Sequence, residues 1–182
     1  MTTTAIVIII IAAIIVAAAL TWYFLRQRRS RTLQSQFGPE YEHAIRQYGD
    51  APKAEAALRA RQRRMEKLHI RPLLPEERER FGQLWHDVQA RFVDNPESSI
   101  HDADNLVSEA MRARGYPMAD FERRAEDISV DHPQVVRNYR AAHAIAVRRE
   151  KGEASTEDLR QALVYYRDLF DELLEAHTGV RR

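Results

Sequence analysis

The feature that most constrains this chain is an uncharged apolar run near its start, from Ala5 to Leu25. It reads AIVIIIIAAIIVAAALTWYFL, and most of its residues are Ile, Val, Leu or Phe. At a rise of about 1.5 Å per residue, a helix of this length is about 31 Å long, enough to cross a hydrocarbon core of about 30 Å. The run has no polar face, unlike the amphipathic helix of a soluble core. The sequence therefore predicts an N-terminal transmembrane helix with the lipid bilayer as its partner.

The residues that close this run predict its orientation. Trp22, Tyr23 and Phe24 end it, and aromatic rings of this kind gather at membrane–water interfaces. Four arginines follow at once: Arg26, Arg28, Arg29 and Arg31. The positive-inside rule places such a cluster in the cytoplasm and the N-terminus outside. We therefore expect all seven residues at the inner face of a bacterial cell membrane, on a single-pass protein with a cytoplasmic C-terminal domain.

A cleaved secretory signal is the alternative to this anchor. Such signals have a basic start, an apolar stretch of about 7–15 residues and a small-residue cleavage site. Residues 1–4 carry no Lys or Arg and the run is too long, although Ala17, Ala18 and Ala19 resemble a cleavage site. The absence of cysteine fits either side of the membrane. An extracytoplasmic or secreted helical domain released by cleavage stays open as the alternative.

The charge pattern divides the rest of the chain in two. Residues 26–71 hold 12 Lys/Arg against 5 Asp/Glu, a net charge of +7, whereas residues 72–182 hold 16 against 22, a net charge of −6. Anionic lipid headgroups attract the first part and repel the second. We expect three parts: an anchor at 1–25, a basic juxtamembrane helical segment at 26–71 and an acidic helical bundle at 72–182.

Proline and glycine stand between periodic apolar segments, and no alternating strand pattern is present. The membrane helix is expected to continue to about residue 36, and further helices are expected at 40–48, 52–68, 75–94, 96–114, 118–128, 131–151 and 155–177. The helix at 52–68 is only weakly amphipathic and is expected at the edge. Short connections favour antiparallel neighbours. The predicted fold class is all-α: an N-terminal transmembrane helix followed by a compact antiparallel bundle of four or five main helices.

Two Glu-x-x-His pairs, Glu40/His43 and Glu66/His69, suggest an alternative function, because inward-facing pairs of this kind hold metals in di-iron bundles. Both pairs lie in charged segments, so solvated helix residues are the simpler interpretation. The alternative is a metal-binding bundle or metalloenzyme that uses these four residues. His143 lies on an apolar face, which favours a hydrogen-bonded core histidine.

No catalytic motif is apparent in the sequence. It shows no nucleophile elbow, P-loop or dinucleotide fingerprint, and without cysteine it has no thiolate chemistry. We therefore expect no cofactor and no enzymatic activity. The interpretation that follows is a membrane-anchored interaction or scaffold module with an unknown protein partner.

Four further arginines could contact anionic lipid headgroups: Arg59, Arg61, Arg63 and Arg64. Phosphate contacts need clustered cations, but these four spread around their helix rather than along one side. No aromatic residue is interleaved among them, which disfavours nucleic acid. Lipid contact and an ordinary solvated surface both stay open.

Three segments carry a family resemblance: RFVDNP at 91–96, ADNLVSEAMRARGYP at 103–117, and SVDHPQVV with GEASTEDLRQALVYYRDLFDELL toward the end. In these the chain resembles a bacterial family of single-span membrane, or secreted, proteins with a helix-rich C-terminal domain. The family has no known activity, so no residue inherits a role. The resemblance implies a bacterial membrane setting and nothing more specific.

Overall fold

The computed structural model describes residues 2–175, apart from the side chains of residues 2–10, 12, 25, 26 and 29. Throughout that range the chain forms helices joined by turns, without a strand, which confirms the predicted all-α class. The helices are α1 (Thr2–Phe37), α2 (Pro39–Tyr48), α3 (Ala51–Met65), α4 (Pro75–Phe92), α5 (Pro96–Arg114), α6 (Phe121–Asp131), α7 (Val136–Glu150) and α8 (Thr156–Leu174).

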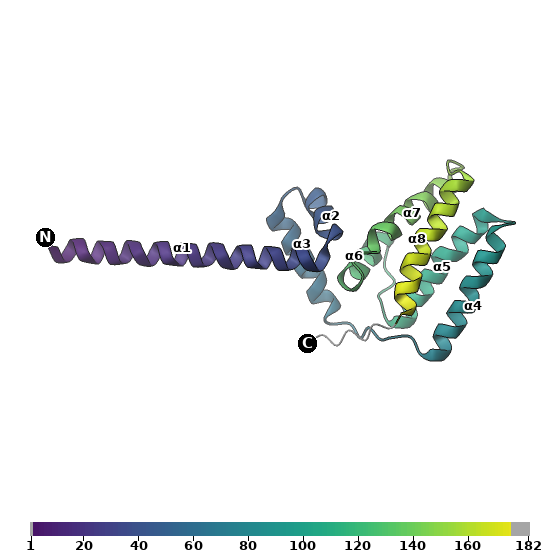
Figure 1. Ribbon diagram of the computed structural model, residues 1–182, viewed down its shortest axis with the longest axis horizontal. Coiled ribbons are helices and arrows are strands. Elements are labelled where there is room, and N and C mark those ends of the chain that lie inside the picture. Colours follow the sequence, from purple (N-terminus) through teal and green to yellow (C-terminus); the bar gives the residue numbers. More distant parts are fainter. Residues whose placement is uncertain (1, 176–182) are drawn as a thin grey trace.

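Helix α1 is continuous through the apolar run and the arginines behind it, and Figure 1 shows it projecting away from the other helices. Its described apolar side chains are exposed; Ile14, for example, exposes 62% of its surface. Among the residues described, no helix offers an apolar stretch long enough to span a bilayer. The predicted span at 5–25 includes residues 5–10, 12 and 25, whose side chains lie outside the described residues. The transmembrane helix therefore stays a prediction.

Local capping explains most of the helix boundaries. Gly38 and Gly49 have positive φ values of 46° and 83°, which end α1 and α2. Asp50 accepts a hydrogen bond of 2.8 Å from the backbone N–H of Lys53 and so caps α3. A capping box opens α8, because Ser155 and Asp158 hydrogen-bond reciprocally.

The bundle is built from two helical hairpins packed side by side. Helices α4 and α5 form one, α7 and α8 form the other, and α5 packs against α8 between them (Figure 1). Trp85 of α4 stacks on Phe170 of α8 with ring centroids 4.7 Å apart. The buried apolar side chains form one cluster that runs from Leu33 in α1 to Leu173 in α8. The C-terminal part of α1, with α2 and α3, therefore shares the core of the bundle.

Three predicted elements differ from the structure. The helix expected at 118–128 begins three residues later, because Asp120 caps α6 at Phe121. A helix was expected to begin at Asp131, but α6 continues to Asp131 and α7 begins only at Val136. The backbone N–H of His132 donates to the carbonyl oxygen of Ile128, so His132 closes α6 instead of opening the next helix. The helix expected at 52–68 ends at Met65, and its inner face is buried, because Leu58 and Met65 lie in the core.

Candidate functional site

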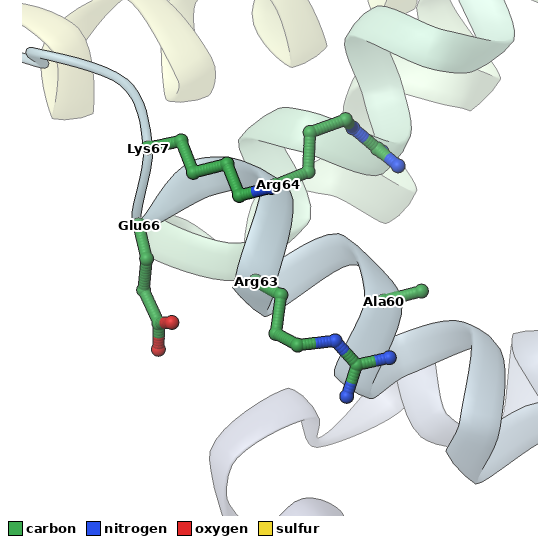
Figure 2. A pocket seen from close by; sticks show the side chains of 5 residues that line it. All are labelled: Ala60, Arg63, Arg64, Glu66 and Lys67. Atoms are coloured by element: carbon green, nitrogen blue, oxygen red, sulfur yellow. The ribbon is translucent and has the colours of Figure 1, made fainter.

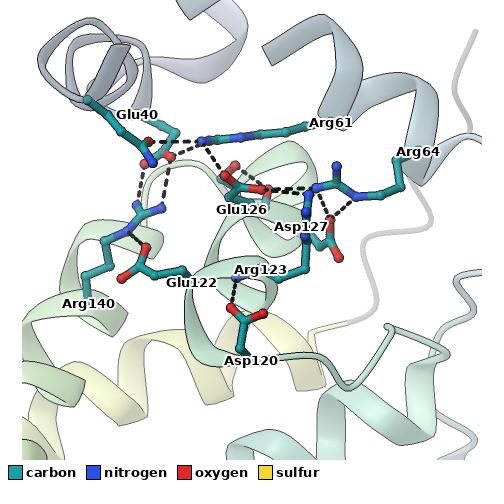
Figure 3. A network of polar contacts seen from close by, with 11 residues as sticks. Glu40, Arg61, Arg64, Asp120, Glu122, Arg123, Glu126, Asp127 and Arg140 are labelled. Carbon is teal, nitrogen blue, oxygen red and sulfur yellow. Dashed lines mark hydrogen bonds and ion pairs between the residues drawn. The ribbon is translucent and has the colours of Figure 1, made fainter. Parts of the chain in front are cut away.

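A network of charged side chains joins the α2–α3 hairpin to the bundle helices α6 and α7 (Figure 3). At one end Glu40 of α2 is almost fully buried. Its carboxylate accepts a hydrogen bond of 2.6 Å from Arg61 of α3 and bonds of 2.6 and 3.1 Å from Arg140 of α7. Two guanidinium groups therefore share one carboxylate at a three-helix junction.

Arg61 is the centre of this network. Only 1% of its surface is exposed. Besides its bond to Glu40, its second terminal nitrogen donates to Glu126 of α6 at 3.2 Å. Its Nε atom is buried and has no hydrogen-bond partner among the described residues. An arginine desolvated to this extent depends on the carboxylates around it.

Arg64, one turn further along α3, extends the network along α6. Its Nε donates to Asp127 at 2.8 Å, and its Nη2 lies 3.4 Å from Glu126. Burial raises the pKa of the Asp127 carboxyl, and the hydrogen bond from Arg64 opposes that shift. Arg123 also reaches Glu126, at 3.2 Å.

The network is balanced in charge. Its four arginines are Arg61, Arg64, Arg123 and Arg140, and its four carboxylates are Glu40, Glu122, Glu126 and Asp127. The basic and the acidic parts of the sequence thus pair with each other inside the protein, because arginines of the basic segment form ion pairs with carboxylates of the acidic bundle. Sequence reasoning missed this site, although the opposite net charges of the two segments were a signal for it.

The four arginines predicted for lipid contact have different surroundings. The lipid contact predicted for Arg61 is wrong, because its guanidinium is buried and cannot reach a headgroup. Arg59 bonds Glu55 at 2.8 Å, and Arg64 bonds Asp127. Arg63 is exposed and lines a shallow hollow with Ala60, Arg64, Glu66 and Lys67 (Figure 2). Lipid contact thus stays a prediction for Arg59, Arg63 and Arg64 alone.

The two Glu-x-x-His pairs do not form a shared metal site. Glu40 is occupied by two arginines, and Glu66 and His69 are exposed after the end of α3. His43 is half-buried; burial, with Arg140 nearby, lowers the pKa of its imidazole. No group of three or more metal-ligating side chains occurs among the residues that the structure describes. The metal-binding alternative is therefore not supported by the arrangement of these four residues.

A second polar cluster, which the sequence did not suggest, closes one end of the bundle. His132 Nδ1 lies 3.1 Å from Glu172 of α8, and its Nε2 lies 3.4 Å from Arg114 of α5. Arg114 also donates to the carbonyl oxygens of Leu173 and Arg71, each at 3.3 Å. Since a guanidinium is always a donor, His132 accepts at Nε2 and donates from Nδ1. Burial lowers the pKa of His132, which favours this neutral form.

The middle of the bundle holds a group of buried polar side chains. The hydroxyls of Tyr139 and Tyr166 are buried beside Arg124, Ser108 and Asp104, and neither makes a hydrogen bond of ordinary length among the described residues. Burial raises the pKa of Tyr139 to about 12 and raises that of Tyr166 as well. His143 differs from its expected hydrogen-bonded state, because its ring stacks on Phe121 at 3.5 Å and its Nδ1 is unpaired. The surroundings of Tyr139, Tyr166 and His143 indicate that these side chains serve the packing of the bundle.

The residues predicted at the membrane interface lie along α1. Trp22, Tyr23 and Phe24 are each more than half exposed, and Arg28 and Arg31 are exposed as well. The side chains of Arg26 and Arg29 lie outside the described residues. This part of α1 thus presents aromatic rings first and arginines after them.

Comparison of the chain with family models, with curated protein sequences and with solved structures finds no match. The family resemblance noted from the sequence therefore stays a prediction.

Proposed function

We propose that the chain is a membrane-anchored helical module that carries no catalytic site and presents its bundle to a protein partner. The observation that carries this proposal is the apolar run on α1, whose described side chains are exposed on all sides. Exposed apolar surface on this scale needs a cover, and a bilayer matches both the length and the lack of a polar face. The arginines behind the run favour the cytoplasmic side for the bundle.

The bundle is suited to a rigid interaction domain. Its aromatic core and charge-balanced network join the anchor-side hairpin to α6 and α7 without a ligand. The titratable groups with clearly lowered or raised pKa values are explained by burial or by capping and ion pairs. Glu157 and Asp158 line an open hollow with Arg148 and Tyr165, but the hydrogen bonds that lower their pKa values come from Arg160 and Ser155 at the start of α8 and from Arg148 of α7. The function therefore depends on residues at the surface of the bundle. Crosslinking of the anchored protein would identify the partner.

The anchor is tested by adding charge to the middle of the run. Changing Ile14→Arg together with Ile15→Arg places two guanidinium groups where each costs about 2.5–3.5 kcal/mol on insertion. The wild-type chain should sediment with membranes and resist alkaline extraction, and this double variant should not. Val93→Arg, at a residue 84% exposed beyond α4, is the matched control and should behave like the wild type. Recovery of the wild-type chain in the extracted fraction would overturn the proposal.

A further inference from the structure

The turn between α2 and α3 lies beside α1, close to the end of the apolar run. Tyr23, Gln27 and Ser30 of α1 line one hollow together with Ala51, Pro52 and Glu55 at the start of α3. Figure 1 shows α2 and α3 alongside the C-terminal part of α1. The first turn of α3 thus reaches back along α1 toward its interface aromatic residues.

Specific contacts fix the hairpin in this position. The Tyr41 hydroxyl lies 3.2 Å from Ser30 Oγ of α1 and donates to Glu55 Oε1 of α3, also at 3.2 Å. Gln62 Nε2 donates to Gln36 Oε1 at 2.7 Å. Leu33 and Phe37 of α1, and Ala54 and Leu58 of α3, are buried in the same core cluster. The turn is therefore held at a defined height on α1.

That height coincides with the membrane interface if α1 is the anchor. Tyr23 belongs to the aromatic residues that close the apolar run, where rings lie at headgroup depth. We propose that residues 49–53, the turn between α2 and α3 together with the first turn of α3, rest on the lipid headgroup layer as a second membrane contact. This inference rests on the proposed function, and it adds that the bundle has a fixed orientation relative to the bilayer.

The geometry also decides which cations face the lipid. Arg28 and Arg31 follow the run by 3 and 6 residues, and Lys53 is exposed in the first turn of α3, where it pairs with Asp50 at 3.1 Å. Arg59 is 6 residues past Lys53, and Arg64 is 11 past it, which is about 9 and 16 Å along α3. Electrostatic attraction is screened over about 8 Å at physiological ionic strength. We therefore assign the headgroup contact to Arg28 and Lys53, in place of the arginines of α3.

The absence of cysteine from the chain makes depth measurements direct. Three single-cysteine variants of the full chain, Pro52→Cys, Val93→Cys and Ile14→Cys, would each carry an environment-sensitive fluorophore. They would be reconstituted into vesicles of phosphatidylcholine and phosphatidylglycerol that contain lipids with a nitroxide on the headgroup or within the acyl chain. The label at position 52 should be quenched by the headgroup nitroxide several-fold more strongly than the label at position 93. Ala56→Cys, an exposed residue one turn further along α3, replaces Pro52→Cys if that variant does not fold.

The label at position 14 separates the two proposals. Quenching at 14 by the acyl-chain nitroxide, with equal weak quenching at 52 and 93, would overturn the second contact and leave the anchor intact. Weak quenching at both 14 and 52 would overturn both. Quenching of 14 within the acyl chains and of 52 at the headgroups supports both.

Discussion

At the residue scale, burial decides what the charged side chains do. Arg61 and Arg64 stand three positions apart on α3, and both turn toward carboxylates of the bundle, whereas Arg63 between them faces solvent. Residues three apart share one face of a helix, so the pattern follows from helical geometry. An arginine on that buried face stabilises the folded chain only through the carboxylates that pair with it.

Arg61→Ala is expected to lower the free energy of unfolding by about 3–5 kcal/mol, because it leaves the buried Glu40 with one guanidinium fewer. Chemical denaturation of the full chain in detergent micelles measures this change. Arg63→Ala is the matched control, two residues further along the same helix, and should change stability by no more than about 0.5 kcal/mol. Equal effects of the two substitutions would show that the network does not hold the hairpin.

The lowered pKa of His132 predicts that the free energy of unfolding depends on pH. Burial lowers its pKa in the folded chain below the ordinary value of 6.5, so the unfolded chain binds more protons between those two values. Its contribution is fully present above 6.5 and is lost as the pH falls from 6.5 toward the lowered folded pKa. His43 and His143 have lowered pKa values too and act with the same sign.

We expect the free energy of unfolding to fall as the pH is lowered below about 6.5, and to fall less steeply in His132→Gln. An amide can still donate toward Glu172 and accept from Arg114 but does not titrate. Denaturant titrations of both chains between about pH 5 and pH 7 provide the comparison. Parallel curves for the wild type and the variant would contradict the assignment of His132.

At the element scale, the sequence predicted most helix starts that a local cap marks, although it placed the start of α6 three residues before the cap at Asp120. Asp50, Asn95 and Ser155 each cap a helix through a side-chain oxygen, and all three boundaries lie within one residue of their expected places. The boundary at Asp131 was missed because its cause is not local. His132 is held by Glu172 and Arg114, which are 40 and 18 residues away.

The candidate site was harder to predict than the helices. Four arginines spread around a weakly amphipathic helix are typical of a solvated surface, and this composition gives no sign that Arg61 is buried. The opposite charges of residues 26–71 and 72–182 could have suggested a pairing between the segments. Which carboxylates take part depends on the tertiary arrangement of α3 and α6, and that arrangement has no local signature.

Two glycines give opposite predictions at this scale. Gly115 ends α5 with a φ of 96°, and a Cβ there would lie 2.7 Å from the carbonyl oxygen of His69. Gly115→Ala should therefore lower the free energy of unfolding by more than about 1 kcal/mol. Gly82 is inside α4, and a methyl group added there would meet no neighbouring atom within 4 Å, so Gly82→Ala should raise stability by about 0.4–1 kcal/mol.

Thermal unfolding of both glycine variants beside the wild type measures these shifts. The midpoint should move down for Gly115→Ala and up for Gly82→Ala. A rise for Gly115→Ala would mean that the linker carrying His69 does not pass this close to the end of α5.

At the scale of the whole molecule, the charge division along the chain has two consequences. Arg61 and Arg64 of the basic segment are neutralised by the bundle, whereas Arg28 and Arg31 on α1 remain exposed next to the apolar run. Buried ion pairs contribute little net stability but require one arrangement of their partners. The network thus fixes the bundle against the α2–α3 hairpin, which in turn packs on α1. A module that presents one surface to a partner from the proposed membrane anchor needs such a fixed position.

The proposed function depends most on α1 crossing the membrane with the bundle on the cytoplasmic side. The direct measurement is labelling of two single-cysteine variants, Thr3→Cys and Val93→Cys, by a membrane-impermeant maleimide on intact spheroplasts. We predict that position 3 is labelled on intact spheroplasts and that position 93 is labelled only after lysis. Labelling of position 93 on intact spheroplasts would contradict the account.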